Sequence, residues 1–169
     1  VLDILGESPD KLASSCTANA LFIRAFREQG LLENGQNQLK DYLIRHGKDR
    51  RWLIECGRYA ALNENWSEAI TQLNAAYPEG FSSMPLYDAL LYLKSLRFTG
   101  ANDKAIDAIA ILFERYPFSE ELAVERGENA IVSRNWTMAV QEWRNLCATR
   151  PDALYKLAVS LRFLGDIDE

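Results

Sequence analysis

One 34-residue pattern recurs along this chain and limits what it can fold into. Ala105 recurs as Ala139, 34 residues later, and Gly57 and Gly127 each lie twelve residues before an alanine of the same frame. A fixed period of this length that carries two helical segments is the sequence signature of a repeat architecture. The pattern therefore predicts an all-α chain built from stacked antiparallel helix pairs.

Capping residues, glycines and prolines divide this frame into helices. The expected helices cover Ser8 to Gln29, Gln38 to His46, Arg50 to Leu62, Trp66 to Tyr77, Pro85 to Phe98, Asn102 or Asp103 to Tyr116, Ser119 to Ser133, Trp136 to Thr149 and Asp152 to Leu164. We expect a divergent or capping helix pair over residues 1–48 and repeats over 49–83, 84–118 and 119–150. Residues 151–169 would form the first helix of a further repeat, so we interpret the chain as a piece of a longer protein.

The first helix pair fits the frame poorly. Asn34-Gly35 is a typical turn pair, and it predicts a loop between Leu31 and Gln36. Gly35 also falls where the frame has its small alanine. The pair is therefore expected to be either a cap or a divergent repeat.

Small residues mark where the two helices of a pair approach most closely. Gly57 and Gly127 share one frame position, and the alanines of the frame share another. Leu93 occupies the glycine position of the middle repeat. This departure predicts either a looser helix crossing there or a compensating small neighbour.

The chain resembles the tetratricopeptide repeat, whose second helix carries an alanine, large apolar residues and a closing proline. The matching residues are Ala105, Ile109, Leu112 and Pro117, then Ala139, Trp143, Leu146 and Pro151, with partial matches at Cys56-Gly57, Arg126-Gly127, Gly100 and Gly165. The resemblance implies a right-handed α-solenoid of stacked antiparallel helix pairs over Arg50 to Glu169. Another antiparallel α-solenoid or an irregular helical bundle is the alternative.

In the family that the chain resembles, the first helices of the pairs line a concave groove that binds an extended peptide or a helix. Carried over residue by residue, this implies a groove that presents Arg51, Arg58, Tyr87, Lys94, Arg97, Phe98, Glu128, Tyr155 and Arg162. The middle of the groove is basic and aromatic, which favours a protein or peptide partner with an acidic segment across Arg58, Lys94 and Arg97. Ile54 and Leu90 stand where the capture of a terminal carboxylate would require a cation, which argues against that mode.

Two similar triplets, Leu96-Arg97-Phe98 and Leu161-Arg162-Phe163, end first helices shortly before a glycine. In one interpretation the leucine packs inward and the arginine is solvated at the helix end, where a cation suits the helix dipole. In the other, the arginine contacts an anion or a peptide. The sequence leaves both open.

The residue types of the chain do not support catalysis. His46 is the only histidine, and it ends a predicted helix beside Gly47, where it is expected to act as a polar cap. Cys16, Cys56 and Cys147 lie on different predicted helices and form no CxxC motif, so neither a zinc site nor a disulfide framework is indicated. We expect no catalytic residue, no cofactor and no metal site in this segment, and a reducing, cytoplasmic location.

Charge and hydropathy also exclude some partners. The formal net charge is −5, whereas non-specific nucleic-acid binding depends on an excess of Lys and Arg. The longest apolar runs fall far short of the roughly 18 to 20 residues that a membrane-spanning helix needs. We therefore expect neither a nucleic-acid nor a membrane partner.

Two functions from different classes fit this sequence. The first is a protein-protein interaction scaffold that binds a peptide or a partner domain in the groove. The second is a regulatory or substrate-guiding appendage of a larger enzyme, such as a carbohydrate-modifying transferase. Leu157, Ala158, Leu161 and Leu164 would lie uncovered on the last helix, which predicts self-association through that helix.

Overall fold

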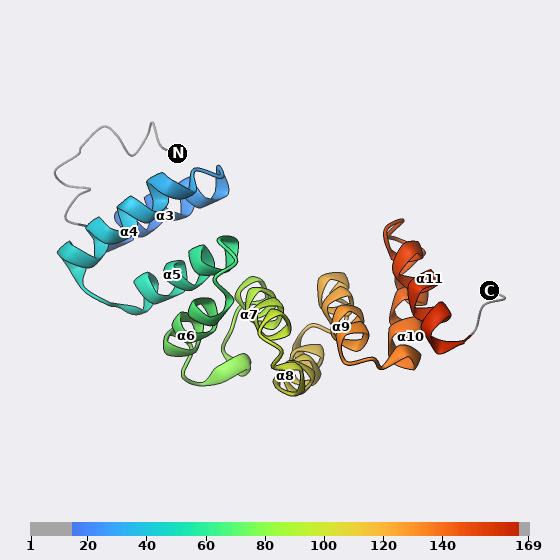
Figure 1. The fold of residues 1–169 in the computed structure, drawn as a ribbon. Coiled ribbons are helices and arrows are strands. Elements are labelled where there is room, and N and C mark those ends of the chain that lie inside the picture. Colours follow the sequence, from blue (N-terminus) through green and yellow to red (C-terminus); the bar gives the residue numbers. More distant parts are fainter. Residues whose placement is uncertain (1–14, 166–169) are drawn as a thin grey trace. The chain divides into compact units, whose positions relative to one another are not determined.

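A computed structural model of the chain describes residues 15–165, and every regular element in that range is helical. Figure 1 shows the helices following one another in a chain of antiparallel neighbours within each part. Their bounds are α3 Cys16–Glu28, α4 Leu32–His46, α5 Arg50–Leu62, α6 Trp66–Ala76, the short 3-10 helix η1 Gly80–Ser82, α7 Leu86–Phe98, α8 Asn102–Arg115, α9 Glu120–Val132, α10 Trp136–Leu146 and α11 Ala153–Leu164. The helix expected to begin at Ser8 is described from Cys16 onward, and its start lies outside the described residues.

The chain divides into two compact units, Val1–Pro78 and Glu79–Glu169, here named the N-terminal and the C-terminal unit. In the N-terminal unit α3 packs on α4, α5 packs on α6, and α3 also contacts α5. The C-terminal unit repeats this scheme, because α7 packs on α8, α9 packs on α10, and α7 also contacts α9. Alternate helices are thus neighbours, which is how a helix pair covers the open apolar face of the next pair.

The helix starts follow the capping signals in the sequence. The Asp49 side chain accepts a hydrogen bond from the Trp52 backbone N–H at 2.8 Å, and the Ser119 hydroxyl accepts one from that of Leu122 at 3.1 Å. These bonds satisfy backbone donors that a helix leaves unpaired at its first turn. At the opposite ends, Gly30 and Gly100 have φ angles of 72° and 78° and let the chain leave α3 and α7.

The loop predicted at Asn34-Gly35 is wrong, because α4 already begins at Leu32. Gly35 lies inside the helix and faces the ring of Tyr59, so close that a Cβ atom would stand 1.6 Å from the Tyr59 hydroxyl oxygen. That hydroxyl donates a hydrogen bond to the Ile23 carbonyl at 2.9 Å, which ties α5 to α3. Gly35 is therefore the small residue of the frame in this helix pair, and its packing overrides its turn propensity.

The small residues of the other pairs also lie at close helix contacts. An added Cβ on Gly57 would approach the Leu73 side chain to 2.7 Å, and one on Gly127 would approach the Trp143 ring to 2.8 Å. Ala69, Ala105 and Ala139 are fully buried, as expected. Leu93 is buried too, and α7 and α8 are less closely packed along their backbones than the helices of the other pairs. The looser crossing expected for this pair is confirmed.

The tryptophans contribute to packing. Trp143 is buried among Ala130, Ala139 and Leu146. Trp52, which has no counterpart in the repeat frame, is also buried and donates its indole N–H to the Leu39 carbonyl at 3.1 Å. Trp136 stacks on Phe163 with ring centroids 4.7 Å apart, so this side chain joins α10 to α11.

We predict that Gly35→Ala lowers the free energy of unfolding by about 1 to 3 kcal/mol, the usual cost of overpacking. Alanine is the better helix former by about 1 kcal/mol, so any loss reports the contact with Tyr59. Chemical denaturation followed by circular dichroism measures the change. Asn34→Ala, at the exposed neighbouring position, is the control and should cost nothing; an equally harmless Gly35→Ala would contradict the packing role of this glycine.

Candidate functional site

Two of the predicted groove arginines lie at one pocket between α3 and α5. This pocket has a volume of about 240 Å³ and is called the arginine pocket below; it is lined by Thr17, Ala20, Leu21, Arg24, Arg51, Ile54, Glu55 and Arg58. Arg51, Ile54 and Arg58 come from one face of α5, because they are spaced three and four residues apart. The structure thus places these residues together, while Arg24 and Leu21 from α3 complete the pocket.

A buried carboxylate organises the inner wall of the arginine pocket. Glu55 accepts a hydrogen bond from Arg58 Nη1 at 2.5 Å and another from Arg27 Nε at 3.0 Å. The side chains of Arg27 and Glu55 are only 7% and 8% exposed. Arg24, at the rim, pairs instead with Glu28 at 2.6 Å. Arg51 is exposed, and its charge faces solvent at the pocket mouth.

In the C-terminal unit the same kind of ion pair holds α7 to α9. Arg97 Nε lies 3.3 Å from Glu125 Oε2, and Arg97 Nη1 lies 3.9 Å from Glu128 Oε2. Lys156 Nζ on α11 lies 3.0 Å from the other oxygen of Glu128. Glu128 therefore links the first helices of three successive pairs. The solvated role considered for Arg97 is wrong, since its charge is engaged with carboxylates of the next pair.

Burial raises the pKa of Glu125 above its usual range, and the Arg97 guanidinium acts in the opposite direction. A carboxyl that is buried in this way holds its charge at a cost, which a neighbouring cation offsets only in part. Arg97 is therefore committed to a partner inside the fold, and an external acidic group would have to compete with Glu125 for it.

The remaining predicted groove residues lie on exposed parts of α7 and α11. Tyr87 and Phe98 are exposed on α7, and Lys94 Nζ lies 6.0 Å from the centre of the Phe98 ring. On α11, Tyr155 is 72% exposed and Arg162 faces solvent one helical heptad further on. These side chains offer aromatic and basic contacts on one face of each helix. Phe163, in contrast, is used in the stack with Trp136.

Several charged residues that shape this surface were missed by the sequence analysis. They are the buried acids Glu55 and Glu125 and their partner Arg27, together with Lys156 and Arg24. One signal was present in the sequence: Arg27 and Glu55 are 28 residues apart, and Arg97 and Glu125 repeat that spacing. Equal spacing of opposite charges in a repeat frame indicates contact between successive pairs.

The groups considered for catalysis have structural partners. His46 Nε2 lies 3.2 Å from the Asn19 amide nitrogen, and its ring lies 4.8 Å from the ring of Tyr42, so it joins α4 to α3 instead of capping α4. Burial raises the pKa of the Cys56 thiol to about 12, which keeps it protonated and weakly nucleophilic. Within residues 15–165, no three His, Cys, Asp or Glu side chains stand close enough to share a metal ion. None of the helices in this range is long and apolar enough to cross a lipid bilayer.

We predict that Glu55→Gln lowers the free energy of unfolding by about 3 kcal/mol, because the buried Arg27 guanidinium loses this counter-charge. Glutamine keeps the size of the side chain, so urea denaturation of the variant isolates the effect of the charge. Glu28→Gln removes a carboxylate from the exposed Arg24 pair and should leave the denaturation midpoint unchanged. Equal midpoints for the two variants would show that the buried pair is not what holds α3 to α5.

Comparison with known proteins bears on the fold. No protein-family model matches the sequence, and no curated protein sequence matches it. Among solved structures, a tetratricopeptide repeat protein from Parabacteroides merdae superimposes with a TM-score of 0.71 at 12% sequence identity. The match covers 89% of this chain and 59% of that protein, so the chain spans about three fifths of its length. Together with the helix pairs described above, this match shows that the chain has a tetratricopeptide-repeat-like fold.

Proposed function

We propose that this chain is a protein-protein interaction module that binds a peptide or a partner domain through the exposed face of the first helices of its pairs. The observation that carries the proposal is the arginine pocket, which brings Arg51 and Arg58 together beside apolar side chains. Few exposed surfaces combine a hollow, apolar walls and convergent cations unless they receive a ligand.

The composition of the arginine pocket indicates the kind of ligand. Three arginines surround it, and two carboxylates, Glu55 and Glu28, pair with two of them. Arg51 adds an exposed charge, while Leu21 and Ile54 supply an apolar floor. A peptide segment that carries an Asp or Glu next to an apolar side chain would complement both features. The overall charge of the chain is negative, so this local basic site stands out.

The C-terminal unit would contribute contacts of a different kind. Arg97 and Glu128 are held in ion pairs, which removes them as strong contacts for an acidic segment. Tyr87, Phe98 and Tyr155 are exposed aromatic side chains on first helices. Exposed tyrosine and phenylalanine are typical contact residues of interfaces, because they bury a large area at a small entropic cost. We assign them, with Lys94 and Arg162, a supporting role in binding.

Peptide selection tests the proposal. A random peptide library displayed on phage and selected on the full chain should yield sequences that combine an acidic and an apolar residue. We predict that Arg51→Glu weakens the binding of a selected peptide at least tenfold in fluorescence anisotropy, because it reverses the exposed charge at the pocket mouth. Rising salt should weaken binding to the unmodified chain as well.

Lys40→Glu provides the matched control, since Lys40 is an exposed cation on α4 and does not line the arginine pocket. It should leave the affinity unchanged. Selected peptides without acidic residues, or an affinity that Arg51→Glu does not alter, would reject the arginine pocket as the binding site.

Self-association through α11 remains a second proposal. Leu161, expected to lie uncovered, is buried, but Ala158 and Leu164 are exposed, and Leu154 exposes more than half of its surface. We predict a concentration-dependent dimer in sedimentation equilibrium, weakened by Leu164→Glu because a charge enters the apolar contact. Leu62→Glu, at a leucine of nearly the same exposure on α5, is the control. A chain that stays monomeric at millimolar concentration contradicts the proposal.

The cysteines bear on the location of the protein. Cys16, Cys56 and Cys147 are all free thiols. Free thiols are typical of reducing compartments, whereas small extracellular domains pair their cysteines. We therefore propose a cytoplasmic location, which expression with a fluorescent tag would test.

A further inference from the structure

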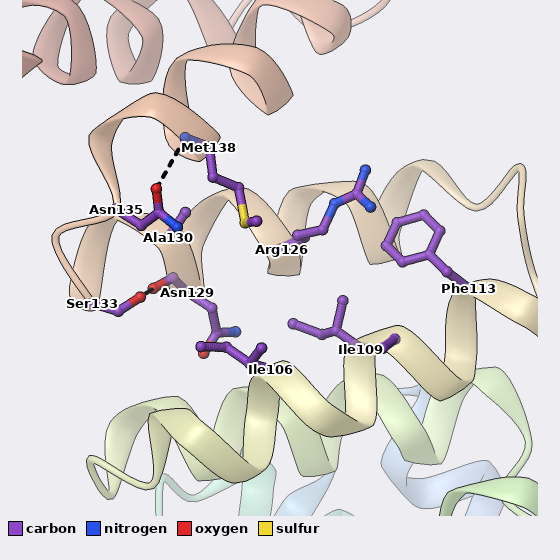
Figure 2. Close-up of a pocket in the computed structure, with 10 residues that line it drawn as sticks. Ile106, Ile109, Phe113, Arg126, Asn129, Ala130, Ser133, Asn135 and Met138 are labelled. Atoms are coloured by element: carbon purple, nitrogen blue, oxygen red, sulfur yellow. Dashed lines mark hydrogen bonds between the residues drawn. The ribbon is translucent and has the colours of Figure 1, made fainter.

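A second pocket lies in the C-terminal unit, between α8, α9 and α10. It has a volume of about 270 Å³ and is called the apolar pocket below. Figure 2 shows Ile106, Ile109 and Phe113 of α8 pointing toward α9, with Met138 of α10 above them. The wall formed by α9 contributes Arg126 and Asn129, which lie on a different face of that helix from Glu125 and Glu128. This pocket is separate from the predicted groove, and nothing in the sequence analysis pointed to it.

Two polar atoms in the walls of the apolar pocket are buried and have no hydrogen-bond partner among the described residues. They are Asn129 Oδ1 and Arg126 Nε. Asn129 is only 1% exposed. Its amide orientation is defined, because Nδ2 donates to the Glu125 carbonyl at 2.9 Å and leaves Oδ1 as the open acceptor. Buried acceptors and donors are almost always satisfied in folded proteins, so this pair indicates a bound group that supplies the missing bonds.

The charge of Arg126 is already balanced inside the fold. Its Nη2 donates to Glu142 Oε2 at 2.7 Å, and the Glu142 side chain is only 5% exposed. The guanidinium also lies over the Phe113 ring, 4.0 Å from its centre. An added carboxylate would therefore find no free charge here. The pocket offers one open acceptor and one open donor in apolar surroundings, which suits a neutral ligand that carries both an N–H and a C=O group.

The size of the apolar pocket sets an upper limit on that ligand. Its volume lies between the about 150 Å³ of a cavity that accepts benzene and the about 300 to 1,000 Å³ of typical cofactor or drug sites. One large side chain with its own amide group fits this range, and a nucleotide or a flavin does not.

We propose that the apolar pocket binds a leucine or phenylalanine residue of a partner peptide. The side chain would insert among Ile106, Ile109 and Met138. The backbone N–H of that residue would donate to Asn129 Oδ1, and its carbonyl would accept from Arg126 Nε. This contact is independent of the arginine pocket, because it lies in the other unit and recognises a neutral residue instead of an acidic one.

Short capped amino acids test this proposal by NMR on the full chain, which at 19.2 kDa is small enough for amide spectra. N-acetyl-leucine methylamide and its phenylalanine counterpart should shift the amide signals of α8, α9 and α10. N-acetyl-alanine methylamide, which has the same backbone but no large side chain, should bind at least tenfold more weakly. An analogue with an ester oxygen in place of the leucine N–H should also lose at least tenfold, because it cannot donate to Asn129.

Two variants separate the pocket from other surfaces. Asn129→Leu removes the acceptor and should weaken leucine-probe binding at least tenfold. Ala110→Phe fills the pocket from its rim and should do the same, and it decides the question if Asn129→Leu does not fold. Arg51→Glu should leave binding of these probes unchanged, so the result does not depend on the arginine pocket. Equal binding of the leucine and alanine probes, or full affinity in a folded Asn129→Leu or Ala110→Phe variant, overturns the proposal.

Discussion

The close approach of two helix backbones within each pair is the constraint on which the rest of this structure depends. Gly57 faces Leu73, Gly127 faces Trp143, and Gly35 faces Tyr59, each at a distance that leaves no room for a further carbon. Because the helices of a pair lie so close, alternate helices such as α3 and α5 can also touch. That second contact is what aligns Arg51 and Arg58 with Leu21 and Arg24 at one hollow.

Buried ion pairs between alternate helices shape the candidate binding surface more than any exposed charge does. Glu55 holds Arg27 and Arg58, and Glu125 holds Arg97. Each carboxylate thus stabilises the stack and at the same time neutralises a cation that a ligand would otherwise meet. The two units differ in what this leaves available, since exposed Arg51 keeps the N-terminal surface basic while aromatic side chains dominate α7.

The helices could be predicted from the sequence because their signals are local: caps such as Asp49 and Ser119, and the 34-residue frame itself. The prediction failed at Gly35, because its partner Tyr59 lies 24 residues further along the chain and no local signal announces it. The buried role of Glu55 was missed for the same reason. The apolar pocket could not be predicted either, since it is formed by the free atoms of Arg126 and Asn129 after their other bonds are made.

The Arg27–Glu55 and Arg97–Glu125 pairs recur at an interval of two repeats. The intervening repeats carry Ala61 and Ile131 in place of the arginines, and Leu91 and Val159 in place of the glutamates. A chain shortened by one repeat would set an arginine against an aliphatic residue, whereas loss of two consecutive repeats would restore the match of arginine with glutamate. The natural module for recombining or lengthening this protein is therefore a quartet of helices, and its repeat number should change in steps of two.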